Sequence, residues 1–287
     1  MFSIIIPTFN NLEYLKVCLN SIKNNSKFAH QIIPHVNIGD DGTKDFLLSK
    51  KFDFSFTDYN SGICEGVNRA AKKSTFEYIL YAHDDFYFCP EWDVALKNEL
   101  DEIGHNKFYL SGIMMNNGPL KLDCGNNLKD FNEKKLLESY DKVNHFDFQG
   151  STWAPHLIHR DLWNKVGGFS EEYFPGTGSD PDLNMKLWNE GVRIFKGINN
   201  CKVYHFGSIV TRKYKNHPTI RTESGSRGGK IFLLKWGITI KFFKKYFLLS
   251  DQKFLNILEE PKKNINFFID LFICKLYLIY LKLTFKK

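Results

Sequence analysis

The chain has 287 residues, of which 43% are hydrophobic and 25% are charged, a balance typical of globular proteins that excludes a wholly disordered or fibrous chain. The formal net charge of +7 is uneven, because residues 1–201 hold 21 Lys and Arg against 27 Asp and Glu, while residues 202–287 hold 18 against 5. The length suits one large domain with or without an appendage, and the basic segment suits nucleic acid, an acidic membrane surface or a diphosphate.

The first 115 residues alternate short apolar runs with segments of helical periodicity. Residues 2–6 contain three consecutive isoleucines and predict a buried strand that ends at Pro7. Because no basic residue precedes this run, a signal peptide is not expected. Asn10 is predicted to cap a helix whose leucines share one face. Further strands are predicted at 32–38, in FEYILYA and at 107–114, with a further helix at 92–103.

The next hundred residues are less regular at first. Residues 115–150 are polar and are expected to cross the sheet as loops. A helix that Gly191 ends and strands near 192–196 and 201–206 follow, and residues 216–229 have the composition of a loop or linker. The alternation of strands and helices predicts the α/β class, with a Rossmann-like, mostly parallel central sheet, helices on both faces and a helical extension at the C-terminus.

The C-terminal segment combines apolar and basic residues. Phe232 to Phe247 form an apolar stripe opposite three lysines, which predicts one basic amphipathic helix. Residues 265–285 are a longer apolar stretch with charged interruptions. We expect residues 230–287 either to lie on an anionic membrane face or to pack on the preceding domain or a second subunit. Spanning is disfavoured, because the charged residues would fall near the middle of the bilayer.

Polar residues follow three of the predicted strands, at the edge of an open α/β sheet where ligands bind. These residues are Thr8 to Asn10, Asp40 with Asp41, and His83 with Asp84 and Asp85. Two adjacent carboxylates repel each other unless a positive group neutralises them. A magnesium or manganese ion that also binds a nucleotide diphosphate would do so, whereas the alternative is a turn or a helix cap.

Five motifs in order are more specific than any one of them. SIIIPTFNNLEYLKVCLNSI, GDDGTKD, NSGICEGVNRA, YAHDDFYFCPEW and GSDPDLNMKLWNEG resemble the family 2 glycosyltransferases with the GT-A fold over about residues 1–210. The resemblance implies an inverting transfer of a sugar from a nucleotide-diphosphate donor to a hydroxyl of a glycan or lipid-linked acceptor, with Mn²⁺ or Mg²⁺ on the diphosphate.

The resemblance also implies a donor site. Asp85 matches the metal-ligating third position of the D-x-D motif, and His205 matches a histidine that touches the metal or the diphosphate. His83 stands where the first aspartate is expected, and we interpret it as a hydrogen-bonding wall because imidazole is a poorer ligand for a hard cation. The donor-binding residues implied by the match are Thr8, Asp40, Asn60, Gly62, Asn68, Arg69 and Asp84.

The last motif implies the acceptor side. Ser179 replaces the first acid of the family's acidic pair, which leaves Asp180 as the general base, in a loop just before a helix, because Pro181 follows it. Asp182 and Trp153 are predicted to contact the acceptor, although Asp182 also fits a helix cap. Trp163 is predicted to be a core residue.

The predicted site divides the chain into three parts. Residues 1–115 are the nucleotide-sugar half, residues 116–215 carry the acceptor and the base, and residues 216–287 form the basic helical extension. The alternatives are a non-catalytic scaffold with a decayed site and a nucleotidyltransferase, which should carry a glycine-rich, basic phosphate loop after its first strand. Arg212 and Lys213 are further candidates for contact with phosphate.

The six cysteines show no CxxC pair, so we expect reduced thiols in a cytoplasmic protein rather than a zinc site or a disulfide framework. The basic charges of the tail lie on helices whose other faces are apolar. Nucleic acid is therefore not expected as a partner, and a peripheral position at the inner face of a membrane is favoured. A homo-oligomer stays open as an alternative.

Overall fold

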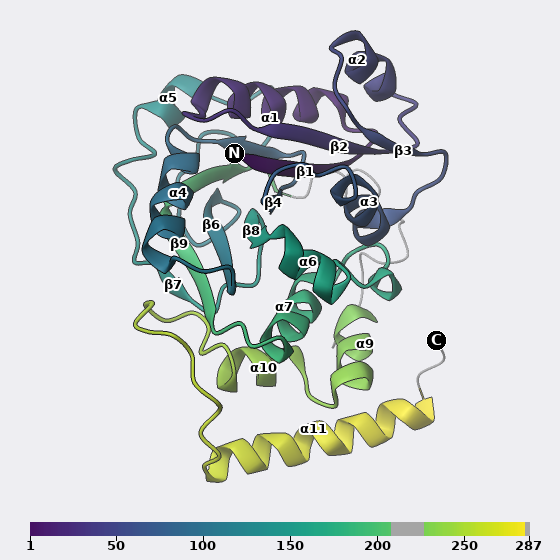
Figure 1. Cartoon of the computed structure of the whole chain (residues 1–287), viewed down its shortest axis with the longest axis vertical. Helices are drawn as coiled ribbons and strands as arrows, with labels where there is room; N and C mark the ends of the chain where they lie inside the picture. Colours follow the sequence, from purple (N-terminus) through teal and green to yellow (C-terminus); the bar gives the residue numbers. More distant parts are fainter. Residues whose placement is uncertain (208–226, 285–287) are drawn as a thin grey trace.

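The structure is a computed structural model that describes residues 1–207 and 227–284 (Figure 1). The strands are β1 (Phe2–Phe9), β2 (Gln31–Asn37), β3 (Ser55–Thr57), β4 (Tyr78–Tyr81), β5 (Phe86–Phe88), β6 (Phe108–Asn116), β7 (Phe148–Gln149), β8 (His156–His159) and β9 (Ile194–His205). They form one sheet in the order β3-β2-β1-β4-β8-β6-β9-β5, with β7 also paired to β9. The first four strands of this order are parallel, whereas β5, β7 and β8 run antiparallel to their neighbours.

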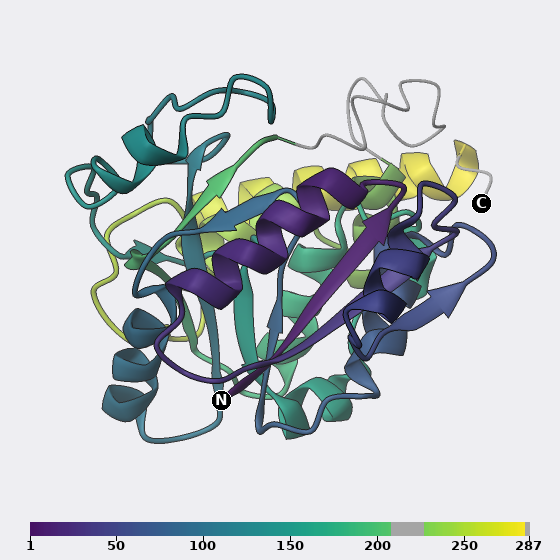
Figure 2. The same cartoon turned by 90° about the horizontal axis from the view of Figure 1, so that it is seen from above.

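Helices cover both faces of the sheet. They are α1 (Leu12–Asn25), α2 (Thr43–Ser49), α3 (Gly62–Ala71), α4 (Trp92–Ile103), α5 (Glu133–Leu137), α6 (Arg160–Val166), α7 (Ser179–Asn189), α9 (Arg227–Trp236), α10 (Ile240–Tyr246) and α11 (Ile265–Thr284), with a short 3₁₀ turn, η1 (Glu171–Tyr173). Figure 1 shows α1 and α2 above strands β1 to β3, and α3, α6 and α7 below them. Seen from above, α1 lies across the strands and α11 lies on the far side of the molecule (Figure 2). The predicted α/β class is confirmed.

The turn after β1 differs from the prediction in two details. β1 continues through Pro7, because β4 pairs with β1 only as far as Ile5 and the missing proline N–H therefore costs no bond on that side. Asn10 does not cap α1. It has a φ of 47°, and its side chain accepts from the Asp40 backbone N–H at 3.0 Å, while the Leu12 N–H donates to Asp41 at 2.8 Å. The turns after β1 and β2 are thereby tied together.

The two strands predicted near 192–196 and 201–206 are one strand, β9. The polar Asn199 and Asn200 interrupt the apolar pattern in the sequence. In the structure they lie where β9 shifts its register against β6, opposite the step from Ser111 to Ile113. A bulge lets a polar pair sit within a long strand while both sides of it stay paired.

The basic extension is also built differently from the prediction. The helix expected over 232–247 is two helices, α9 and α10, because Gly237 ends α9 with a φ of +71°. Phe232 and Phe243 are fully buried in the same core as the sheet. The stripe therefore packs on the catalytic domain, and the expectation that it enters a membrane interface is wrong.

The helix α11 packs on α9 and α10 with one side only. Its buried residues, Phe267, Cys274 and Leu281, recur every seven positions. Throughout 1–207 and 227–284, we find no helix whose length and apolar character would suffice for a bilayer crossing.

Candidate active site

One cluster of side chains is able to hold a metal ion. The antiparallel pair β5–β9 places Phe86 opposite His205, so that Asp85, one residue before β5, lies beside the end of β9. His205 Nε2 is 3.5 Å from Asp85 Oδ2, and His83 Nδ1 is 4.0 Å from Asp85 Oδ1. Ligand atoms of the three side chains all lie within 4.8 Å of one another. The structure thus brings the two predicted metal ligands together and adds His83 to them.

The electrostatics of this cluster suit a cation. Burial lowers the pKa of His83 to about 4, with a smaller lowering from His205 and an opposing effect of Asp85. His83 is therefore neutral at pH 7, and a neutral imidazole has a lone pair for a metal. Two imidazoles and one carboxylate form a donor set that suits Mn²⁺ better than Mg²⁺, which prefers oxygen ligands.

Asp84 lies at the same edge of the sheet as the metal-competent cluster and is buried. Burial and, to a smaller extent, Asp85 raise its pKa to about 7, against an opposing effect of the neighbouring Thr8 and Asn11. Among the residues that the structure describes, Asp84 Oδ2 and Thr8 Oγ1 have no hydrogen-bond partner. Buried polar atoms without partners cost free energy, so this pair is prepared to bind a polar ligand.

Asp180 lies in the first turn of α7 rather than in a loop, because α7 begins at Ser179, two residues earlier than predicted. Its side chain is 27% exposed, and Oδ1 is 3.6 Å from His156 Nδ1, too far for a hydrogen bond. The surrounding protein desolvates the carboxyl group and raises its pKa to about 7. A pKa near the working pH is what general base catalysis requires.

The buried ring of Tyr81 connects Asp180 with the metal-competent cluster. The centroid of the Tyr81 ring lies 5.3 Å from the centroid of the His83 ring and 5.1 Å from that of the His156 ring. His156 is buried, and its Nδ1 is 2.9 Å from the hydroxyl of Tyr109. The candidate base and the metal-competent cluster are therefore neighbours across one side chain.

Several buried polar atoms around Asp180 lack a hydrogen-bond partner within the described ranges. Asn184 follows Asp180 by one helical turn, and its side chain donates to the Ser151 carbonyl at 2.9 Å. Ser111 lies opposite His156 in the pairing of β6 with β8. The atoms without partners are Asp180 Oδ1, His156 Nε2, Asn184 Oδ1, Ser151 Oγ, Ser111 Oγ and Gln149 Nε2. Such a group is expected where a polar ligand binds.

Asp182 lies in a different environment from Asp180. It is fully buried and accepts hydrogen bonds from Ser170 at 2.6 Å, Tyr173 at 3.2 Å and the indole of Trp236 at 2.8 Å. Lys235 lies 3.0 Å away. Both carboxylate oxygens thus accept hydrogen bonds from Ser170, η1 and α9. The predicted contact of Asp182 with the acceptor does not fit this geometry.

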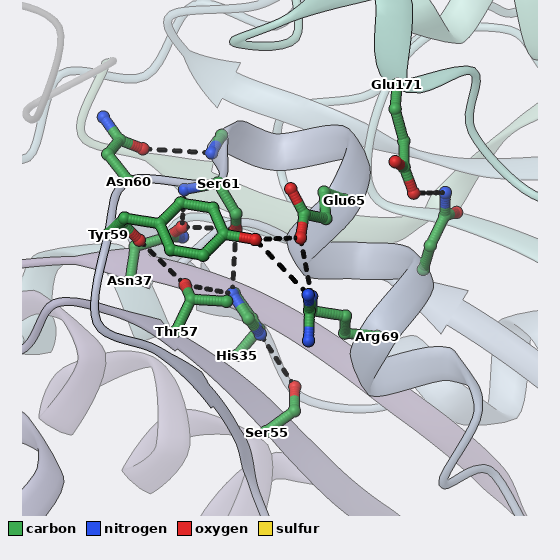
Figure 3. A network of polar contacts seen from close by, with 12 residues as sticks. His35, Asn37, Ser55, Thr57, Tyr59, Asn60, Ser61, Glu65, Arg69 and Glu171 are labelled. Carbon is green, nitrogen blue, oxygen red and sulfur yellow. Dashed lines mark hydrogen bonds and ion pairs between the residues drawn. The ribbon is translucent and has the colours of Figure 1, made fainter.

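A polar network between β2 and α3 includes Asn60, one of the residues predicted to bind the donor (Figure 3). Asn60 accepts from the Gly62 N–H at 3.0 Å, and Asn37 accepts from the Ser61 N–H at 2.8 Å and from its hydroxyl at 2.6 Å. Gly62 has a φ of +71°, and a Cβ there would meet Phe174 and Pro175. Asn60 and Gly62 thus shape the start of α3.

The other predicted donor residues are held in different ways. Arg69 is exposed and pairs with Glu65 at 2.7 Å. Asn68 donates to the Phe169 carbonyl at 2.8 Å and accepts from its N–H at 2.9 Å, so it clamps the VGGF turn. Asp40 is exposed beside the end of β2.

The two tryptophans considered in the sequence differ in their burial and contacts. Trp163 is 4% exposed, which confirms it as a core residue. Trp153 is partly buried, and its indole donates to the Gly112 carbonyl at 2.9 Å. Arg212 and Lys213 lie outside the described residues.

The sequence analysis missed two residues that the structure places in the site. His156 stands in a run that reads as an ordinary strand, and its place beside Asp180 depends on β8 lying between β4 and β6. Asn11 has no role assigned from the sequence, because Asn10 is predicted as the cap, yet its side chain lies beside Asp84. A signal for His156 is available in the sequence, since a histidine inside an apolar run is uncommon and calls for a polar partner.

Comparisons with known proteins agree with this geometry. The family model for glycosyl transferase family 2 matches residues 3–147, about half of the chain. The chondroitin synthase of Pasteurella multocida (strain Pm70) is 24% identical over an alignment of 275 residues that covers 81% of this chain and 26% of that protein. The chain thus spans about a quarter of the length of this relative.

Solved structures share the fold. S. aureus TarS 1-349 has a TM-score of 0.54 at 18% identity, over 71% of this chain and 60% of that one. Its complex with UDP-GlcNAc has a TM-score of 0.51 at 17% identity, over 71% and 57%. GalNAc-T7 with UDP, GalNAc and Mn²⁺ has a TM-score of 0.53 at 12% identity, over 71% and 43%. The chain belongs to glycosyl transferase family 2 and has the GT-A fold.

Proposed function

We propose that the chain is an inverting glycosyltransferase that moves a sugar from a nucleoside-diphosphate donor to a hydroxyl of a glycan or lipid-linked acceptor. The observation that carries the proposal is the position of Tyr81, whose ring lies between His83 of the metal-competent cluster and His156 beside Asp180. Leaving-group binding and proton abstraction are thereby adjacent, as a displacement at an anomeric carbon requires.

The donor is placed along the ends of β1, β2 and β4. Thr8, Asp84 and Asp40 would contact the nucleoside, and Asn60 with Gly62 would shape the floor beneath it. Asp85, His205 and His83 would hold a divalent cation, Mn²⁺ by preference, which supplies positive charge to the diphosphate when it is bound. On this assignment residues 1–115 carry most of the donor site, and residues 116–215 carry the base and the acceptor side.

Asp180 would take the proton from the acceptor hydroxyl. Its side chain is 27% exposed, and its buried Oδ1 has no hydrogen-bond partner among the described residues, so the accessible part of the carboxylate would meet an incoming hydroxyl. Its raised pKa makes it a stronger base than an ordinary aspartate. Trp153 would lie on the acceptor side.

The relatives suggest the chemistry of the substrates. TarS has been solved with UDP-GlcNAc and GalNAc-T7 with UDP and GalNAc, and the curated relative is named chondroitin synthase. These names support a uridine-diphosphate sugar, in particular an N-acetylated one, as the donor and a growing polysaccharide as the acceptor. Because the identities are low, the sugar and the linkage are part of the proposal.

A screen of UDP-sugars for hydrolysis and transfer, with Mn²⁺, Mg²⁺ or chelator, tests the function. We expect turnover of one or a few donors with Mn²⁺ and its loss in chelator. Asp85→Ala should lose both turnover and the effect of the metal on donor binding. Donor binding without turnover under any metal would favour the decayed scaffold. Pyrophosphate release from a nucleoside triphosphate and a sugar phosphate would favour a nucleotidyltransferase.

A further inference from the structure

The outer side of α11 is a large exposed apolar surface. The side of α11 that faces α9 and α10 buries Phe267, Cys274 and Leu281. The opposite side consists of large apolar residues that are 52–82% exposed, which we call the outer face: Ile265, Phe268, Ile269, Phe272, Ile273, Leu276, Ile279, Tyr280 and Leu283.

A helix that is apolar all round is normally buried all round. Soluble monomers rarely expose an apolar surface as continuous as this one. The helix lies along one edge of the molecule, with α9 and α10 on its inner side (Figure 1). The outer face is therefore covered by something else when the protein functions.

The charges around the outer face indicate what covers it. Lys275 and Lys282 lie on α11 along one border of the face, and Lys262 and Lys263 precede the helix; all four are exposed. The one acid of α11, Asp270, is held by Lys245 and Tyr246, each at 2.7 Å. An apolar face with a cationic border matches an anionic lipid surface, in which the side chains enter the acyl region and the lysines reach the headgroups.

The alternative occupant is a second copy of the chain. In a two-fold interface with antiparallel helices the cationic border would face another cationic border, and with parallel helices it would face the opposite border of α11. Within Ile265–Thr284, all of which the structure describes, no unpaired acid compensates this repulsion, because Asp270 is already paired with Lys245. Charge complementarity therefore favours lipid over self-association.

The geometry points to α11 as a peripheral membrane anchor that lies in the plane of an anionic bilayer, with its outer face in the lipid. The anchor is α11 rather than the 232–247 stripe, which is buried. At about 1.5 Å per residue the helix is about 30 Å long, so it lies across several lipid headgroups. Because α9 lies between α11 and η1, the anchor would position the catalytic domain at the surface without taking part in the reaction.

Vesicle flotation of the full chain tests the anchor. The vesicles contain phosphatidylglycerol and phosphatidylcholine in equal amounts, or phosphatidylcholine alone. We expect flotation with the anionic vesicles at low salt and weaker flotation at high salt. The double variant Phe272→Gln/Leu276→Gln should bind at least about tenfold more weakly, since each change removes a buried apolar side chain from the lipid. The matched control Leu48→Gln/Leu137→Gln, on the distant α2 and α5, should bind as the parent does.

A second pair of double variants measures how much the lysines contribute to vesicle binding. Lys275→Glu/Lys282→Glu should weaken binding to the anionic vesicles by about tenfold or more, whereas Lys50→Glu/Lys51→Glu, with the same change in net charge, should not. Equal flotation on neutral vesicles, or no effect of the α11 variants, would overturn the proposal. A dimer in sedimentation that Phe272→Gln/Leu276→Gln dissociates would show that the outer face binds a second copy instead.

Discussion

At the scale of single residues, the candidate site combines a buried and a partly buried carboxyl group, both with raised pKa values. Asp84 and Asp180 each titrate near pH 7 because burial disfavours their charged forms. They differ in their neighbours, since Asp84 lies beside another carboxylate whereas Asp180 lies beside a neutral histidine. The pKa of His156 is lowered to about 3 by burial and then by His83. Asp180 is therefore the carboxyl group that can take up a proton without disturbing the metal-competent cluster.

The first prediction concerns Asp180 as the base. Asp180→Asn keeps the size and polarity of the side chain but cannot take the proton, so turnover should fall by roughly 10²–10⁴-fold while donor binding changes little. In the parent, turnover should rise as the pH passes through about 7, and this rise should be absent from the residual activity of the variant. Steady-state kinetics from about pH 5.5 to about pH 8.5 measure both effects.

A control for this variant is Asp161→Asn, which changes an aspartate that is 77% exposed on α6. It should keep full turnover and the same pH profile. Normal turnover of Asp180→Asn would refute the assignment of the base.

The second prediction follows from the sign of the same pKa shift. The pKa of Asp180 in the folded chain, about 7, is above the ordinary value of 3.8. The folded state therefore binds the proton more tightly than the unfolded state between these values, and the stability from this group is lost as the pH rises from about 4 to about 7. Asp180→Asn should reduce the loss of stability over this range. Urea unfolding at a series of pH values measures it, and an unchanged slope would contradict the assigned pKa.

At the scale of elements, Asp182 joins α7, η1 and α9. Its carboxylate accepts from side chains of η1 and α9 and pairs with Lys235 in a fully buried position. The same carboxylate holds Ser170. Because α7 also carries Asp180, this contact fixes the base relative to the C-terminal helices.

The third prediction tests this connection. Asp182→Ala leaves Lys235 and the Trp236 indole without their acceptor, so the free energy of unfolding should fall by about 3–5 kcal/mol. Asp251→Asn removes an exposed partner that lies 4.0 Å from Lys244, and it should cost less than about 1 kcal/mol. Denaturant unfolding of both variants compares the two losses. Equal losses would mean that Asp182 does not anchor α9.

At the scale of the whole molecule, α9 and α10 belong to the core, whereas α11 packs on one side only. The side chains of this region that are buried with the sheet core include these five: Phe232, Leu233, Phe242, Phe243 and Leu248. At about 1.5–3 kcal/mol each, their burial contributes about 7–15 kcal/mol, which is as large as the net stability of a typical domain. The fold as observed therefore depends on this part of the extension.

The fourth prediction contrasts two truncations. A chain ending at residue 226 should fail to unfold cooperatively, because it loses all five of these side chains. A chain ending at residue 263 should stay folded, with a lower Tm, because it loses only the inner side of α11. Circular dichroism during thermal unfolding compares them. Cooperative unfolding of the shorter chain would mean that the catalytic domain does not need α9 and α10.

Much of the fold was predictable from local patterns, because the apolar runs of β1, β2 and β6 and the periodicity of α1 and α4 are strong. The candidate site was less predictable from the sequence. The contact of Asp85 with His205 depends on an antiparallel pair between segments more than a hundred residues apart, which no local pattern encodes. The role of Asp182 depends on its contact with the distant Trp236. The burial of Phe232 likewise depends on the sheet core against which it packs. An amphipathic stripe predicts that a face is covered, but not by what.

The outer face of α11 also determines how the protein behaves during purification. In water without lipid, a face of this kind adsorbs to phenyl resin, to plastic and to detergent micelles, so the chain should be handled as an amphiphile. Recovery should improve with a mild nonionic detergent above its micelle concentration. Elution from a hydrophobic column should come later than for Phe272→Gln/Leu276→Gln, in which the same surface is interrupted.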